Sequence, residues 1–103
     1  MAYSVYFNGV AREHFLNAAL WYVDKNEALV DLLEADVDRT VGYIVSQPNS
    51  YPVVYRDIHR AVLKRFPYNI YYKINKEEIE VIAFLHHRQN KEIILRDLGI
   101  PEE

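Results

Sequence analysis

The sequence predicts a protein of the α+β class, in which a helical hairpin packs on an antiparallel sheet. Two segments in the first half of the chain, residues 10–24 and 27–45, space their apolar side chains as helices do. The second half, from residue 58 to residue 85, is dominated by strand-like apolar and aromatic runs. A loop with two prolines, residues 47–52, separates the halves. With one strand at the start, the expected order is β-α-α-β-β-β.

Length and composition indicate a single domain covering residues 1–103. Half of the 103 residues are hydrophobic, which favours a folded core over a disordered chain. The sequence has no cysteine, so disulfides, thiol chemistry and Cys-ligated metal sites are excluded. No apolar run approaches the roughly 20 residues of a membrane span, and the first residues lack the pattern of a signal peptide. We therefore expect a cytoplasmic protein that does not bind a membrane.

The first strand is expected at residues 2–8, where aromatic and apolar side chains alternate with polar ones. Asn8 and Gly9 end this strand with turn chemistry. The first helix follows over residues 10–24, a stretch without glycine or proline. A polar break at residues 24–26 then leads into the second helix, and so short a connection predicts an antiparallel pair.

The second helix, residues 27–45, has a clearly two-sided pattern. Five side chains form its apolar stripe: Leu29, Leu33, Val37, Val41 and Ile44. Charged side chains are expected on the opposite, solvent-facing side: Asp31, Glu34, Asp36, Asp38 and Arg39. The helical pair should bury its apolar side on one face of the sheet.

The remaining strands are expected at residues 58–66, 68–74 and 79–85. Pro67 ends the first of them, because proline cannot donate to a strand ladder. Two tight connections in succession predict an antiparallel meander. A last helical turn is expected within residues 91–98. Six side chains should lie in the core: Leu33, Val37, Val41, Phe66, Ile70 and Val81.

A local basic patch stands out against the net charge of −3. Residues 54–75 contain five Lys or Arg residues and one acid, whereas residues 1–50 contain three bases and seven acids. An acidic molecule is a poor indiscriminate binder of nucleic acid, but a local patch can contact an anionic partner. The candidates for target or nucleic-acid contact are Arg60, Lys64, Arg65 and Lys73. Exposed bases are also common on the solvent side of a sheet.

A second candidate group closes the last predicted strand, at His86, His87 and Arg88. A histidine with a pKa near neutrality suits proton transfer, and an arginine can hold a phosphate with its planar fork. If the protein cleaves RNA, these three residues are the catalytic candidates. The alternative interpretation is that the histidines only end a strand.

Metal and cofactor sites are not expected. The four histidines show no spacing typical of a metal site, and the three glycines are isolated, so no phosphate-binding loop is present.

Two stretches of the second half carry a resemblance to a known family. Residues 61–74 contain Arg65-Phe66-Pro67-Tyr68 followed by Ile70 and Tyr72, and this pattern resembles the central hairpin of RelE/ParE toxins. Residues 79–88 resemble their final core strand, which ends in His-x-Arg or a similar motif. The predicted element order agrees with theirs.

The resemblance implies a type II toxin that is neutralised by a cognate antitoxin protein. RelE-like members cleave messenger RNA on the ribosome, whereas ParE-like members inhibit DNA gyrase and are not known to need a catalytic residue set. Nucleolytic relatives commonly add a tyrosine near the C-terminus, and no tyrosine follows Tyr72 here. The sequence therefore favours a ParE-like, non-enzymatic toxin. The alternatives are a RelE-like endoribonuclease and an inactive relative that serves as a binding module.

Overall fold

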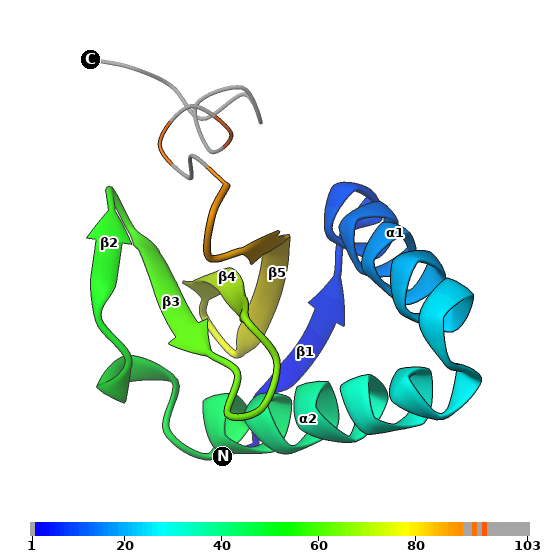
Figure 1. Cartoon of the computed structure of the whole chain (residues 1–103). Helices are drawn as coiled ribbons and strands as arrows, with labels where there is room; N and C mark the ends of the chain where they lie inside the picture. The colour runs from blue at the N-terminus through cyan, green and yellow to red at the C-terminus, as the bar shows by residue number, and fades with distance from the viewer. Residues whose placement is uncertain (1, 90–91, 93, 95–103) are drawn as a thin grey trace.

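The computed structural model describes residues 2–89, 92 and 94 and has the predicted α+β architecture, with two helices on one sheet (Figure 1). Both helices, the first strand and the meander are confirmed, and a strand and a short 3-10 helix (η1) precede the meander. The expected turn within residues 91–98 lies mostly outside the described residues. The elements are β1 (Ser4–Phe7), α1 (Gly9–Lys25), α2 (Glu27–Ser46), η1 (Pro48–Ser50), β2 (Val53–Tyr55), β3 (Ile58–Val62), β4 (Tyr68–Asn75) and β5 (Glu78–His86).

Two asparagines set the boundaries of the helices. The side-chain oxygen of Asn8 accepts the Ala11 N–H at 2.9 Å, which satisfies one of the free donors at the start of α1. Asn26 ends α1 by donating its backbone N–H to Tyr22, and its side chain accepts the Ala28 N–H at the start of α2. A single residue therefore joins the helices, which meet at this corner and spread apart from it (Figure 1).

The sheet has the order β1-β5-β4-β3-β2 and is mixed, which corrects the expectation of a purely antiparallel sheet. The meander β3-β4-β5 is antiparallel as predicted, but β1 runs parallel to β5, with Ser4 opposite Glu78 and Phe7 opposite Val81. Tight turns fix the direction of the strands that they join. No turn joins β1 to β5, so the local sequence carried no information about their relative direction.

The predicted core is confirmed. Leu33, Val37, Ile70 and Val81 are buried between the helices and the sheet, and half-buried Val41 and Phe66 pack against them. A second, smaller cluster lies on the opposite face of the sheet and includes Ile58, Tyr71, Ile82 and Leu85. Both faces of the strands are therefore apolar near the centre, which explains why these segments read as nearly continuous apolar runs.

Two strand boundaries differ from the prediction. Strand β3 ends at Val62 rather than residue 66, because the next residues turn away from the sheet as a loop. Strand β2 was not predicted, since three residues after Pro52 carry too little periodic signal. It pairs with β3 through a tight turn in which Arg56 has a φ of 51°.

Asp36 holds the β3–β4 loop to α2 and corrects a further expectation. The sequence placed Asp36 on the exposed side of the helix, yet its side chain is buried. Its carboxylate accepts backbone N–H groups from Lys64 at 3.3 Å, Arg65 at 2.7 Å and Phe66 at 3.0 Å. It also pairs with the Arg39 guanidinium. In the folded helix Asp36 borders the buried stripe, and partners about 30 residues away in the sequence make its burial favourable.

We expect Asp36→Asn to lower the free energy of unfolding by roughly 2–5 kcal/mol, because the amide NH2 replaces one of the two accepting oxygens and then faces N–H donors, and because the charge that faces Arg39 is lost. Urea unfolding followed by circular dichroism measures this cost. The matched control is Asp38→Asn, an exposed carboxylate on the same helix, whose effect should stay within about 0.5 kcal/mol. Equal effects of the two variants would contradict the role of Asp36.

Candidate functional site

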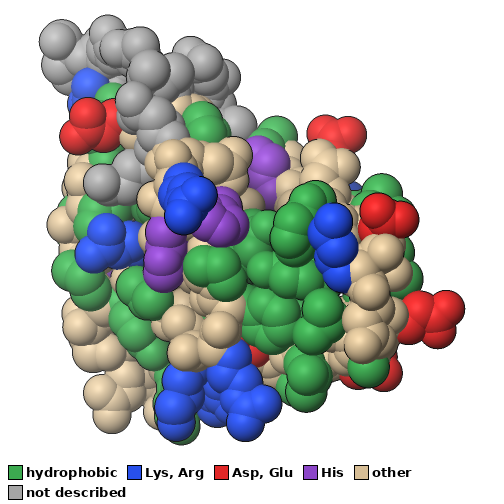
Figure 2. All heavy atoms as spheres, in the orientation of Figure 1, with side chains coloured by type: hydrophobic (Ala, Val, Ile, Leu, Met, Phe, Trp, Pro, Cys, Tyr) green, Lys and Arg blue, Asp and Glu red, His purple; other side chains and the backbone are tan. Residues whose placement is uncertain are grey.

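The four basic candidates do not form one patch. Lys64 and Arg65 are exposed on the β3–β4 loop, and the partly exposed Arg39 pairs with Asp36 beneath this loop. Figure 2 shows Lys and Arg side chains gathered at its lower edge, where this loop crosses α2 in Figure 1. Arg60 and Lys73 lie elsewhere in the sheet.

Arg60 follows Ile58 by two residues on β3, so it projects from the face opposite the helices. Lys73 lines a small hollow with Asp57, Glu78 and Glu80, and these carboxylates offset its charge. Of the predicted contact residues, the fold therefore places only Lys64 and Arg65 together.

The end of β5 orders His86 and leaves its neighbours exposed. The backbone N–H of His86 donates to the Gln89 side-chain oxygen at 2.8 Å, and its ring Nδ1 accepts the Arg88 N–H at 3.0 Å. The ring also meets Tyr68 edge-on, with 5.2 Å between ring centroids. His87 and Arg88 are exposed.

His86 lines a pocket of about 360 Å³ between α1 and the ends of β4 and β5. We name it the histidine–aromatic pocket, and its lining consists of His14, Asn17, Ala18, Trp21, Tyr22, Tyr68, Phe84, His86 and Gln89. Figure 2 shows hydrophobic side chains in the middle of this face, bordered by histidine side chains. Of its residues, the sequence prediction had singled out only His86 for function. The sequence did carry one indication of this pocket, because three of its residues are spaced four apart and so share one face of a helix: His14, Ala18 and Tyr22.

Stacked rings build the wall of the histidine–aromatic pocket. Tyr68 stacks on Phe84 with ring centroids 4.8 Å apart and 7° between the planes. Tyr22 meets both Tyr68 and Phe66 edge-on. Burial raises the pKa of Tyr68 and of Tyr22, so both hydroxyls keep their protons at neutral pH.

His14 connects α1 to the edge of β5. Strand β1 ends at Phe7, opposite Val81, so the backbone N–H of Phe84 has no strand partner on that side. The ring Nδ1 of His14 accepts this N–H at 3.2 Å. Burial lowers the pKa of His14, an effect that the nearby Glu13 carboxylate partly opposes. The neutral ring is the form that can accept the hydrogen bond.

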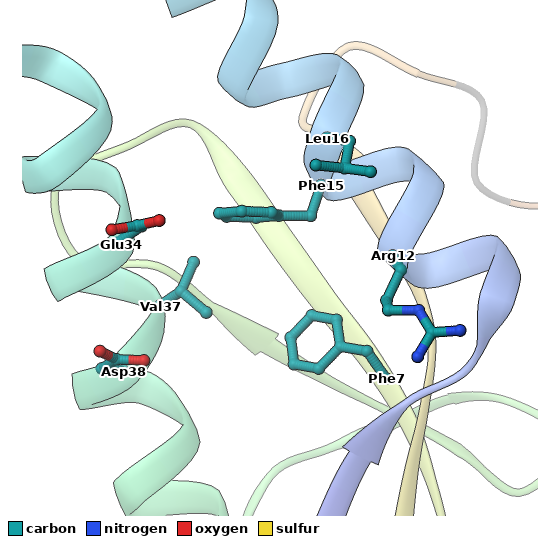
Figure 3. A pocket seen from close by; sticks show the side chains of 7 residues that line it. All are labelled: Phe7, Arg12, Phe15, Leu16, Glu34, Val37 and Asp38. Atoms are coloured by element: carbon teal, nitrogen blue, oxygen red, sulfur yellow. The ribbon is translucent and has the colours of Figure 1, made fainter. Parts of the chain in front are cut away.

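A second hollow surface lies between the helices, on the side of α1 that carries Leu16. Two adjoining depressions of about 500 and 620 Å³ both include Leu16. Figure 3 shows Phe15 and Leu16 of α1 facing Glu34 and Val37 of α2 across the first of them. We name the two depressions the inter-helix groove. Its floor is mainly apolar, with Leu20, Val23 and Val30, and its α2 side carries four acids: Glu27, Asp31, Glu34 and Asp38.

Within the described residues, no cluster of three or more histidine and acidic side chains is placed to hold a metal ion. No helix in this part of the chain is long and apolar enough to cross a membrane.

Comparison with solved structures finds a close likeness in fold. The chain superposes on a chain of the chromosomal ParDE TA system from P. aeruginosa with a TM-score of 0.72, covering 82% of this chain and 95% of that chain at 15% sequence identity. The fold that the RelE/ParE resemblance implied is thus confirmed. Comparisons of the sequence with protein-family models and with curated proteins find no match.

The lowered pKa of His14 predicts a pH-dependent stability. The unfolded chain takes up a proton as the pH falls below the ordinary histidine value of 6.5, whereas the folded chain resists it. The contribution of neutral His14 to the free energy of unfolding is therefore fully present above this value, and it is lost as the pH falls through the lowered pKa. His14→Asn keeps an acceptor for the Phe84 N–H but cannot titrate, so it should lose less stability between about pH 7.5 and about pH 5.

Urea unfolding at both pH values measures this difference. The matched control is His87→Asn, at an exposed histidine, which should keep the pH dependence of the wild type. An unchanged pH dependence in His14→Asn would contradict the assigned contact.

Proposed function

We propose that this protein is the toxin of a type II toxin–antitoxin pair and that it acts in the cytoplasm by binding DNA gyrase. The observation that carries the proposal is the fold likeness to a chain of a ParDE TA system, joined to the RelE/ParE-like pattern of residues 61–74 and 79–88. The two observations are used together, because a structural likeness at 15% sequence identity establishes the fold and not the function.

The positions of the polar candidates support binding rather than RNA cleavage. General acid–base catalysis needs its groups within hydrogen-bond reach of one reacting atom. Among the described residues, Arg60 and Lys73 project from other parts of the sheet than His86, and Lys64 and Arg65 lie on the loop beside α2. The exposed pair His87 and Arg88 lies beside His86 at the end of β5, with the two imidazole ring centroids 6.3 Å apart, away from Arg60 and Lys73.

The inter-helix groove is the surface that we propose for the antitoxin. Leu16, Leu20 and Val23 lie on one side of α1, and Leu16 and Leu20 are 58% and 64% exposed. Apolar side chains so exposed and so close together mark an interaction surface. Because the α2 side carries acids, the matching occupant is an amphipathic helix with basic residues beside its apolar stripe.

Truncation of the groove floor tests this partner. Leu20→Ala should weaken antitoxin binding about tenfold, because an anchor side chain at an interface commonly contributes more than 1 kcal/mol. Leu32→Ala is the matched control, since Leu32 is 43% exposed on α2 but lines neither depression. Calorimetric titration with the antitoxin measures both. Equal affinities for the two variants would place the antitoxin elsewhere.

The mode of toxicity is tested with the histidines. If the protein poisons gyrase through a broad contact, His86→Ala and His87→Ala should remain folded and keep at least part of the inhibition of DNA supercoiling, since most single truncations cost under about 1 kcal/mol. A nuclease would instead lose roughly 10²–10⁴ in rate with one acid or base.

Two assays distinguish the possibilities: supercoiling by purified gyrase and messenger-RNA integrity in a purified translation reaction. Cleaved messenger RNA that disappears in the histidine variants would overturn the gyrase proposal and support the RelE-like alternative. A wild type that is inert in both assays would indicate a binding module.

A further inference from the structure

Helix α2 presents a second exposed stripe, on the flank that faces away from the inter-helix groove. Leu32, Arg39 and Tyr43 follow one another at intervals of seven and four residues, so they share one side of the helix. The buried Asp36 belongs to the same stripe and binds the β3–β4 loop, which places two exposed bases of that loop beside it. We name five side chains of this flank the basic–tyrosine surface: Leu32, Arg39, Tyr43, Lys64 and Arg65.

The basic–tyrosine surface and the inter-helix groove carry opposite charges. Three cations lie on the basic–tyrosine surface, and the buried carboxylate of Asp36 offsets one of them, which leaves two positive charges. The groove is lined by four acids of α2 and by one cation, Arg12. The two flanks of a single helix are therefore complementary in charge, although the net charge of the whole chain is only −3.

Exposed apolar side chains accompany the charges on both flanks. The groove contains Leu16 and Leu20, which are 58% and 64% exposed. The basic–tyrosine surface contains Leu32 and Tyr43, which are 43% and 59% exposed. The groove fits an amphipathic helix with basic residues beside its apolar stripe, and the outer flank of α2 has this chemistry. Figure 1 shows α2 along the lower edge of the molecule, where another molecule can reach it.

We propose that the basic–tyrosine surface of one copy of this chain binds the inter-helix groove of a second copy. The exposed apolar side chains of the two surfaces meet, and the bases of the first copy pair with the acids that border the groove of the second. The contact joins two different surfaces, so a dimer keeps one free surface of each kind. Further copies can therefore add head to tail.

A second copy fits these charges better than a nucleic acid does. A polyanion at Lys64 and Arg65 would also meet the four acids on the same helix, and the chain as a whole is negative. In a second copy, the same acids become half of the contact. An antitoxin is proposed for the same groove, so self-association and antitoxin binding are alternative uses of it. The self-association does not rest on the proposed toxin activity.

Sedimentation velocity of the chain alone tests the proposal. We expect the mean mass to rise with concentration above that of the 12.2 kDa monomer, and the rise to be clear at about 100 µM, in the range of weak protein contacts. Raising the NaCl concentration from about 0.05 to about 0.5 M should reverse it, because salt screens ion pairs at the surface.

Charge reversal on each surface identifies the contact. The double variant Lys64→Glu, Arg65→Glu should weaken the association at least about tenfold. Its fold should be kept, because these residues bind Asp36 through their backbone N–H groups. The double variant Asp31→Lys, Glu34→Lys should have the same effect from the groove side. Mixed in equal amounts, the two variants should associate again, because each reversed surface then meets a surface of opposite charge.

A matched control separates the contact from a general effect of net charge. The double variant Arg56→Glu, Lys76→Glu changes the net charge equally at exposed positions outside both surfaces, and it should associate as the wild type does. Circular dichroism verifies that each variant is folded. The milder double variant Lys64→Gln, Arg65→Gln removes the charges without reversing them and should show a smaller loss of association.

Three results would overturn the proposal: a wild type that stays monomeric up to about 1 mM, an equal loss of association in the control, or no recovery in the mixture of the two reversed variants. Association that both reversals leave unchanged would also overturn it and would assign the contact to another surface, such as the edge strand β2. A monomeric wild type that inhibits supercoiling would leave the toxin proposal standing, so the two proposals fail separately.

Discussion

One buried carboxylate determines how the two layers of this molecule fit together. Asp36 is the point at which α2 holds the β3–β4 loop, because it accepts three successive backbone N–H groups that would otherwise lack partners between helix and sheet. The loop in turn fixes where β4 begins. Tyr68, the first residue of β4, is thereby placed on Phe84 and against His86. A contact on one side of the molecule thus sets the geometry of a pocket on another.

The sequence predicted the features that local periodicity controls and missed those that depend on distant partners. Both helices and the three strands of the meander followed from apolar spacing and turn residues. The parallel pairing of β1 with β5 did not, since no short connection encodes it. The burial of Asp36 was missed for the same reason: the helical pattern classifies a carboxylate as exposed, and only the loop 28–30 residues later reverses this.

The same distinction between local pattern and distant partners applies to the residues of the candidate site. His86 was singled out because it ends a strand in a motif, and it does line a pocket. His14 was not, because its importance depends on where β1 stops and leaves the Phe84 N–H free, which is a property of the folded sheet. The basic residues Arg60 and Lys73 are close in the sequence to Lys64 and Arg65, but strand alternation and the loop separate them. Charge clustering in a sequence is therefore weak evidence for a charged surface when the cluster spans two strands.

Helix α1 contributes residues to the core, to the inter-helix groove and to the histidine–aromatic pocket. Its fully buried positions are the small residues Ala11 and Ala18, whereas Leu16, Leu20 and Trp21 are more than half exposed. Small residues let α1 lie close to β5, and the large apolar side chains are then free to form the inter-helix groove and the rim of the histidine–aromatic pocket. Burying these side chains against the sheet would gain about 1.5–3 kcal/mol each. A fold that leaves them outside has kept that free energy available for binding, and the helix is accordingly where partners are to be sought.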